Sequence, residues 1–116
     1  MLKIHAKKLD TVEVLSLEGQ IINGGETEIL HNCVQLSPNT SDFVLDLSNV
    51  TVVDAHGLGV LLQLREQVLA KGVHFELINV SKRLYRIFQI TRLNTVFAIS
   101  AGVERFAYQH RLPVAA

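Results

Sequence analysis

The sequence predicts an α/β domain with a mixed, mostly parallel sheet of about five strands and about four helices. From Asn23 onward, strand-like and helix-like segments alternate along the chain, an order typical of parallel strands joined by helices. Before Asn23, two strand-like segments follow each other directly, which predicts an antiparallel hairpin. The chain has 116 residues, of which 48% are hydrophobic, enough for one core. We therefore expect a single domain over residues 1–116.

The leading hairpin is expected within the first 19 residues. Apolar and polar residues alternate from Leu2 to Lys7, the pattern of a strand with one solvent-facing side. The lysines in this strand disfavour pairing with another sheet, so it is expected at the edge. A turn at Leu9-Asp10 leads into a second, more apolar strand from Val12 to Gly19.

A first helix is expected from Glu26 to Leu36, after the break at Asn23-Gly24-Gly25. Acidic residues stand at its start, where they suit the positive end of the helix dipole, and its apolar residues form one stripe. The segment Ser37-Pro38-Asn39 ends it.

The most informative stretch covers residues 43–72. The run Phe43–Val50 predicts a buried strand, and residues 51–54 are expected to form the turn after it. Asp54 is a suitable N-cap, so a helix should begin at Ala55 or His56. Gly72 ends the helix as a left-handed residue. The helix residues expected to face the core are Leu58, Leu61, Leu62, Val68 and Leu69.

Two glycines, Gly57 and Gly59, occur in the first turns of this helix. Each costs about 1 kcal/mol relative to alanine in a helix interior. Such a cost indicates that something approaches this turn closely.

The remaining segments continue the alternation. A strand is expected over residues 73–78, and Ser81 can cap a short helix whose inner residues are Leu84, Ile87 and Phe88. Lys82, Arg83 and Arg86 lie on the outer side of this helix and form a small basic rim that could meet an acidic partner. A last strand over residues 96–99 and a final helix after Ser100 complete the prediction.

The strand, the turn at Asp54, the Gly57-Leu58-Gly59 triplet and the leucine-rich helix together resemble the signature of the STAS domain, the fold of bacterial anti-sigma factor antagonists. The resemblance covers residues 10–108 at the level of pattern and is strongest over residues 43–72. The regulated members carry a phosphorylated serine or threonine directly after the aspartate, where this chain has Ala55. The chain also has Ile22 where the family has an acidic residue.

The resemblance implies a binding surface and a partner. In antagonists of this family, the unphosphorylated domain binds a partner-switching serine kinase that is also an anti-sigma factor, and phosphorylation breaks the complex. By residue matching, the surface here would comprise Asp54, Ala55, His56, Gly57, Leu58, Asn23, Gly24 and Ser81. Because Ala55 has no hydroxyl, that switch cannot operate there; Thr51 and Ser48 are alternative hydroxyls.

The expected function is therefore non-enzymatic binding of an anti-sigma factor/serine kinase or another STAS protein, without phosphorylation at Ala55. A homodimer is left open. One alternative is an accessory subunit of a membrane lipid transporter that docks on its ATPase. Another is a sensor of a nucleotide or small ligand at the N-terminus of the central helix, since such termini attract anions.

Composition argues against several other classes. Eleven basic residues balance eleven acidic ones, which predicts no nucleic-acid partner. No apolar run approaches the ~20 residues of a bilayer span, and the N-terminus lacks a signal core, so we expect a cytoplasmic protein without membrane insertion. Cys33 is the single cysteine, which excludes an internal disulfide and a multi-cysteine zinc site.

The sequence also predicts no cofactor, metal or catalytic residues. The triplet Gly57-Leu58-Gly59 lacks the third glycine of a dinucleotide fingerprint, and no P-loop lysine follows it. His31 and Cys33 are two residues apart and point to different helix faces, which disfavours joint metal binding. Asp54 and His56 lack an activated nucleophile in a recognisable context.

Overall fold

The computed structural model describes residues 2–22 and 39–100 of the chain. In these ranges the elements are β1 (Leu2–Leu9), β2 (Val12–Ile21), β3 (Asp42–Val53), α2 (Ala55–Ala70), β4 (His74–Ile78), α3 (Lys82–Ile90), the 3-10 helix η1 (Leu93–Thr95) and β5 (Ala98–Ser100). About four helices were expected, whereas the described residues contain two α-helices and η1. The helices expected over 26–36 and after Ser100 lie outside the described residues.

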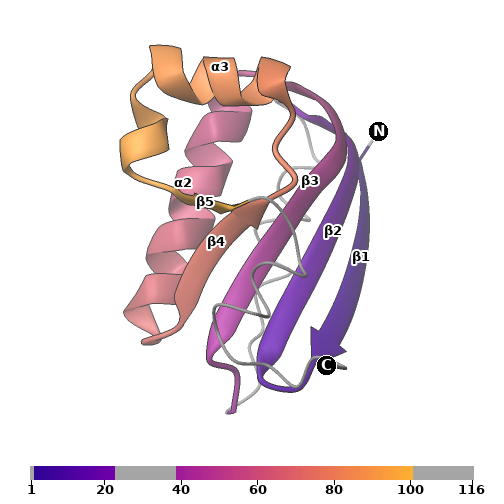
Figure 1. Cartoon of the computed structure of the whole chain (residues 1–116), viewed down its shortest axis with the longest axis vertical. Helices are drawn as coiled ribbons and strands as arrows, with labels where there is room; N and C mark the ends of the chain where they lie inside the picture. Colours follow the sequence, from indigo (N-terminus) through magenta and orange to yellow (C-terminus); the bar gives the residue numbers. More distant parts are fainter. Residues whose placement is uncertain (1, 23–38, 101–116) are drawn as a thin grey trace.

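The five strands form one sheet in the order β1-β2-β3-β4-β5, with α2 beside it (Figure 1). β1 and β2 are antiparallel and their register runs from Leu2 opposite Gly19 to Leu9 opposite Val12. The pairs β2-β3, β3-β4 and β4-β5 are parallel. The prediction of a mixed, mostly parallel sheet with a leading hairpin is thus confirmed, and β1 lies at an edge as expected.

β3 is longer than expected and irregular near its carboxyl end. The strand was expected to end at Val50, but it continues to Val53. Ser16 pairs with Asp46 and Ile21 with Val53, so five steps along β2 match seven along β3, and the register shifts twice. Such bulges interrupt the alternation of side chains between the two faces. The side chains at the end of β3 therefore do not continue the alternation between faces that its first half shows.

The main core lies between α2 and one face of the sheet. Phe43 and Phe75 stack on adjacent strands with ring centroids 6.0 Å apart, and Phe88 of α3 joins the core through Phe97, 5.6 Å away. The largest fully buried side chains are Phe43, Phe88, Leu17, Ile21, Leu45, Leu47, Leu61, Leu64, Leu77 and Ile78.

The inner face of α2 differs in part from the expected one. Leu58, Leu61 and Val68 are buried as predicted, whereas Leu69 is 39% exposed and Leu64 is fully buried. Leu64 follows Leu61 by three residues and precedes Val68 by four, so these three share one side of the helix, while Leu69 lies about 100° further round.

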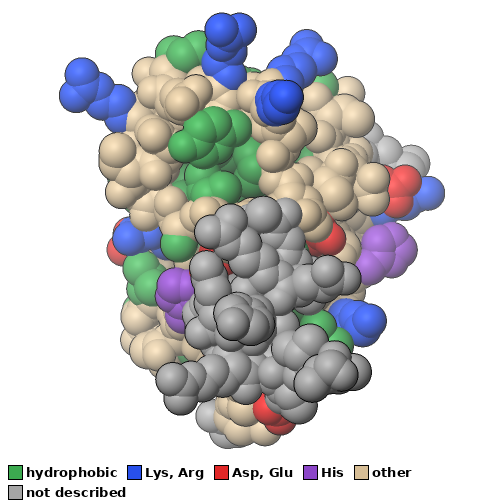
Figure 2. Space-filling view, in the orientation of Figure 1, with side chains coloured by type: hydrophobic (Ala, Val, Ile, Leu, Met, Phe, Trp, Pro, Cys, Tyr) green, Lys and Arg blue, Asp and Glu red, His purple; other side chains and the backbone are tan. Residues whose placement is uncertain are grey.

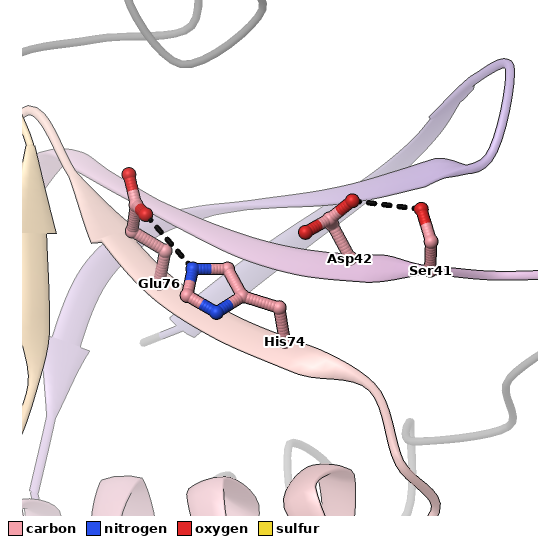
Figure 3. Close-up of polar contacts among 4 residues, drawn as sticks. All are labelled: Ser41, Asp42, His74 and Glu76. Carbon is pink, nitrogen blue, oxygen red and sulfur yellow. Dashed lines mark hydrogen bonds and ion pairs between the residues drawn. The ribbon is translucent and has the colours of Figure 1, made fainter. Parts of the chain in front are cut away.

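The opposite face of the sheet carries a smaller apolar cluster of Val12, Val14, Val44 and Ile78. The same face holds two buried carboxylates, Asp42 and Glu76, drawn in Figure 3. Nε2 of His74 lies 3.0 Å from Oε1 of Glu76, and the hydroxyl of Ser41 donates to Oδ2 of Asp42 over 2.7 Å. These contacts provide polar partners for the two carboxylates.

Candidate functional site

Asp54 stands at the junction of β3 and α2 and caps the helix. Its side-chain Oδ1 accepts a hydrogen bond from the backbone N–H of Gly57 over 2.8 Å, and its backbone is extended, with φ −96° and ψ −177°. Its own N–H donates to the carbonyl of Ile21 at the end of β2. The expected N-cap and the expected start at Ala55 are confirmed. The start of α2 is therefore tied to two parallel strands.

Ala55 and His56 are the first two residues of α2, and both are exposed. They follow the carboxyl end of β3, the edge of a parallel sheet at which ligand and partner sites commonly occur in open α/β folds. The half-buried Asp54 adjoins them. Together these three residues form a small surface with polar and apolar parts, and the N-cap hydrogen bond of Asp54 holds it in place.

Gly57 is buried, and the group that approaches it closely belongs to β2 of the same chain. A Cβ added at Gly57 would lie 2.8 Å from the carbonyl carbon of Ile21 and closer still to its oxygen, whereas a Cβ at Gly59 would have none of the described residues' atoms within 4 Å. A close approach was expected at both glycines and is present at Gly57 alone. Glycine is needed there because the first turn of α2 packs against the backbone of β2.

The other residues of the expected surface have different environments. Leu58 is 9% exposed and belongs to the main core, so in this structure it faces the sheet. Asn23 and Gly24 lie outside the described residues. Ser81 is exposed, and its hydroxyl caps α3 by accepting from the N–H of Leu84 over 3.1 Å. The predicted cap at Ser81 is confirmed.

A small hollow connects the end of β3 with the start of α3. Its volume is about 80 Å³, and among the described residues it is lined by Val50, Thr51, Val52, Val53, Ser81, Arg83, Leu84 and Ile87. The structure thus brings Ser81 near Val53, the residue directly before Asp54. Of the six expected surface residues that the structure describes, four at this end of the domain are not buried: Asp54, Ala55, His56 and Ser81.

The two hydroxyls considered as alternative acceptors lie on β3. The hydroxyl of Thr51 donates to the carbonyl of Gly19 over 3.1 Å, across the irregular pairing of β2 and β3. Ser48 is exposed, and its backbone N–H donates to Oδ1 of Asp46. Thr51 therefore has a structural role in joining the two strands.

Within the described ranges, no three His, Cys, Asp or Glu side chains are arranged to hold a metal ion. His31 and Cys33 lie outside these ranges. The first turn of α2 is already capped by a carboxylate through the N–H of Gly57. A phosphate at the same position would be repelled by that carboxylate and would have to displace it.

Comparison with known proteins decides the family, because the STAS domain model matches residues 3–105. The chain belongs to the STAS domain family. The resemblance found in residues 43–72 is thereby confirmed at the level of the family.

This STAS domain is similar to the anti-sigma-B factor antagonist of Bacillus subtilis (strain 168), with 28% identity over 103 residues, covering 89% of this chain and 94% of the relative. The crystal structure of an anti-sigma factor antagonist from Mycobacterium paratuberculosis is 21% identical, has a TM-score of 0.80 and covers 96% of this chain and 95% of its own. The unphosphorylated form of the anti-sigma factor antagonist SpoIIAA is 14% identical, with a TM-score of 0.67 over 98% of this chain and 100% of its own.

The likeness to the two solved structures shows the fold, and likeness to antagonists supports a protein-interaction role for this STAS domain. In the described residues, the structure has no helix that is both long and apolar enough to cross a membrane.

Sequence reasoning missed two features of this end of the STAS domain. It did not place Thr51, Val52 and Val53 in a strand beside α3, although all three are β-branched residues, which favour a strand. It also did not identify Ile21 as the group that requires glycine at position 57, since nothing in the local sequence indicates which distant backbone will approach.

Proposed function

We propose that this STAS domain is a non-enzymatic protein-interaction module of the anti-sigma factor antagonist type. Its partner is an anti-sigma factor/serine kinase or another STAS protein. It binds this partner through the α2-start surface, which we define as Asp54, Ala55, His56 and Ser81. The relatives support a protein-interaction role, and the proposal assigns that role to this particular surface.

The observation that carries the proposal is the exposure of Ala55 and His56 on a helix start that is held in place. The cap by Asp54 and the packing of Gly57 on Ile21 hold the helix start against the sheet. A surface that keeps its shape loses little conformational entropy when it binds. The α2-start surface therefore suits recognition by a rigid partner.

Ala55 determines how such binding is regulated. Phosphorylation adds nearly two negative charges and strong acceptors, and beside Asp54 these charges would repel a partner that fits the uncharged surface. An alanine cannot accept phosphate. We therefore expect binding without control at this position, as in a constitutively competent antagonist or a scaffold subunit.

The nucleotide-sensor alternative has less support, because the N-terminus of α2 is already capped by a carboxylate. The transporter alternative binds through the face of the central helix, α2, and has a different partner. Identification of the partner therefore separates it from the proposal.

The test is affinity capture of the protein from an extract of its own cells, with an Ala55→Arg variant in parallel. Arginine at this exposed position should leave the fold intact and obstruct the surface. Gln63→Arg is the matched control, because Gln63 is an exposed residue further along α2. We expect a serine kinase or STAS protein to be recovered with the wild type and the control and to be lost with Ala55→Arg.

The recovered partner is then purified and its affinity for each variant is measured by calorimetry. Recovery of a transporter ATPase that depends on Ala55 would favour the transporter alternative. Recovery of any partner equally well with Ala55→Arg would contradict the proposed surface.

A further inference from the structure

Positive charge is concentrated in one segment of this neutral chain. Residues 77–100 contain four basic residues, Lys82, Arg83, Arg86 and Arg92, and no acidic residue. The other residues of the chain therefore carry seven basic against eleven acidic side chains, from totals of eleven each. A net charge of zero thus conceals a basic region and an acidic remainder.

The structure gathers most of this charge on the outer face of α3. Lys82, Arg83 and Arg86 are exposed, while Leu84 and Phe88 on the inner side are buried in the core. Figure 2 shows Lys and Arg side chains projecting at the end of the molecule where Figure 1 places α3, next to hydrophobic side chains. The basic residues are free to meet solvent or a partner.

This face of α3 is hollowed. A groove of about 580 Å³ is lined, among the described residues, by Val80, Lys82, Arg83, Tyr85, Arg86 and Gln89. Arg83 also lines the small hollow that reaches Ser81 and the end of β3. The groove therefore adjoins the α2-start surface on the same side of the domain.

We propose that this groove on α3 binds an acidic segment of a protein partner. This inference deepens the proposed function and rests on it for the partner being a protein. Three exposed cations without a neighbouring acid on α3 attract carboxylates along the segment. Tyr85, which is 36% exposed, and Val80 add apolar contact for a side chain between the carboxylates.

The shape and polarity of the groove favour a peptide over other anions. A single phosphate would fill a small part of 580 Å³. A helix that lies on a membrane buries its apolar face in the lipid, but the apolar face of α3 is used by the core. An extended or helical acidic segment can contact the cations in succession.

The probe is a short synthetic peptide rich in glutamate with one central phenylalanine. Its affinity for the full chain is measured by calorimetry at low and high salt. The test variant is the double substitution Lys82→Glu/Arg86→Glu. The control is Lys3→Glu/Lys7→Glu, which changes the net charge equally on the exposed edge strand β1. All four positions are exposed, and thermal unfolding verifies that each variant folds.

We expect the groove variant to bind about tenfold more weakly, since two attractive contacts between exposed charges become repulsive. The control should change binding little, and added salt should weaken binding of the wild type. In NMR spectra, the peptide should shift amide signals of residues 80–89.

Three results would overturn the inference: no binding of the peptide to the wild type, equal loss in the two variants, or stronger binding of inorganic phosphate or anionic vesicles than of the peptide. The Ala55→Arg variant should retain the peptide. If the peptide does not bind but a partner is still captured in a way that depends on Ala55, the inference about an acidic segment is wrong and the proposed function is unaffected.

Discussion

The backbone carbonyl of Ile21 occupies the space that a Cβ on Gly57 would need, with its carbon 2.8 Å from the ideal Cβ position. Two segments 36 positions apart in the sequence therefore touch through their backbones at the start of α2. The same carbonyl accepts the N–H of Asp54. One peptide group of β2 thus fixes both the entry of the chain into α2 and the distance between helix and sheet.

Replacement of Gly57 by alanine should destabilise the protein strongly. The added methyl would collide with backbone, which cannot rotate away as a side chain can, and overpacking of this kind costs about 3 kcal/mol. Chemical unfolding in urea would measure the loss as a lower midpoint.

Gly59→Ala is the matched control for that substitution. In the part of the chain that the structure describes, nothing lies within 4 Å of a Cβ added at position 59, so alanine should raise the free energy of unfolding by about 1 kcal/mol through its higher helix propensity. Equal effects of the two substitutions would show that the contact with Ile21 does not restrict position 57.

The fold could be predicted from the sequence because its signals are local. Period-two alternation identified β1, an apolar segment after the turn at Leu9-Asp10 identified β2, and the caps at Asp54 and Ser81 placed the starts of both described α-helices. The error at the end of β3 has a different origin. Two bulges against β2 change the alternation there, and a bulge depends on the partner strand, which a single segment does not reveal.

The candidate site was predictable in part for the same reason. The exposed Ala55 and His56 follow from the position of the cap, which is local. The hollow between Val52 and Arg83 depends on how α3 meets the sheet, which is a long-range contact. The role of Gly57 also depends on a long-range contact, the one with Ile21.

The cap and the proposed binding role of Asp54 can be separated by two substitutions. Asp54→Ala removes the acceptor for the N–H of Gly57 and should lower the free energy of unfolding by about 1 kcal/mol. Asp54→Asn keeps a comparable acceptor without the charge, so stability should change little. If the partner recognises the carboxylate, Asp54→Asn should weaken binding while thermal unfolding stays the same. If Asp54→Asn lowers the free energy of unfolding as Asp54→Ala does, the charge of the carboxylate stabilises the fold.

His74 and Glu76 should prove coupled in stability. The side chain of Glu76 is 7% exposed and that of His74 is 42% exposed, and Oε2 of Glu76 is a buried atom that has no hydrogen-bond partner among the described residues. His74→Ala would leave a buried carboxylate with fewer contacts, which should cost about 1 kcal/mol.

Glu76→Gln removes the charge, so His74→Ala should cost less in that background. A double-mutant cycle of unfolding free energies would measure the difference. Additive effects would mean that the 3.0 Å contact contributes nothing to stability.

Ala55→Asp tests whether negative charge at the start of α2 opposes binding. Ala55 is exposed at the first helical position, where an acidic residue interacts favourably with the helix dipole, by about 0.5 kcal/mol. The unfolding temperature should therefore stay the same or rise slightly. Affinity for the partner identified by capture should fall, because the new carboxylate stands beside Asp54 and imitates part of the charge of a phosphate. Ala55→Asn supplies similar size without the charge and should bind more tightly than Ala55→Asp. Equal affinity of the two variants would show that charge at this position does not control binding, and it would remove the physical reason for linking Ala55 to constitutive activity.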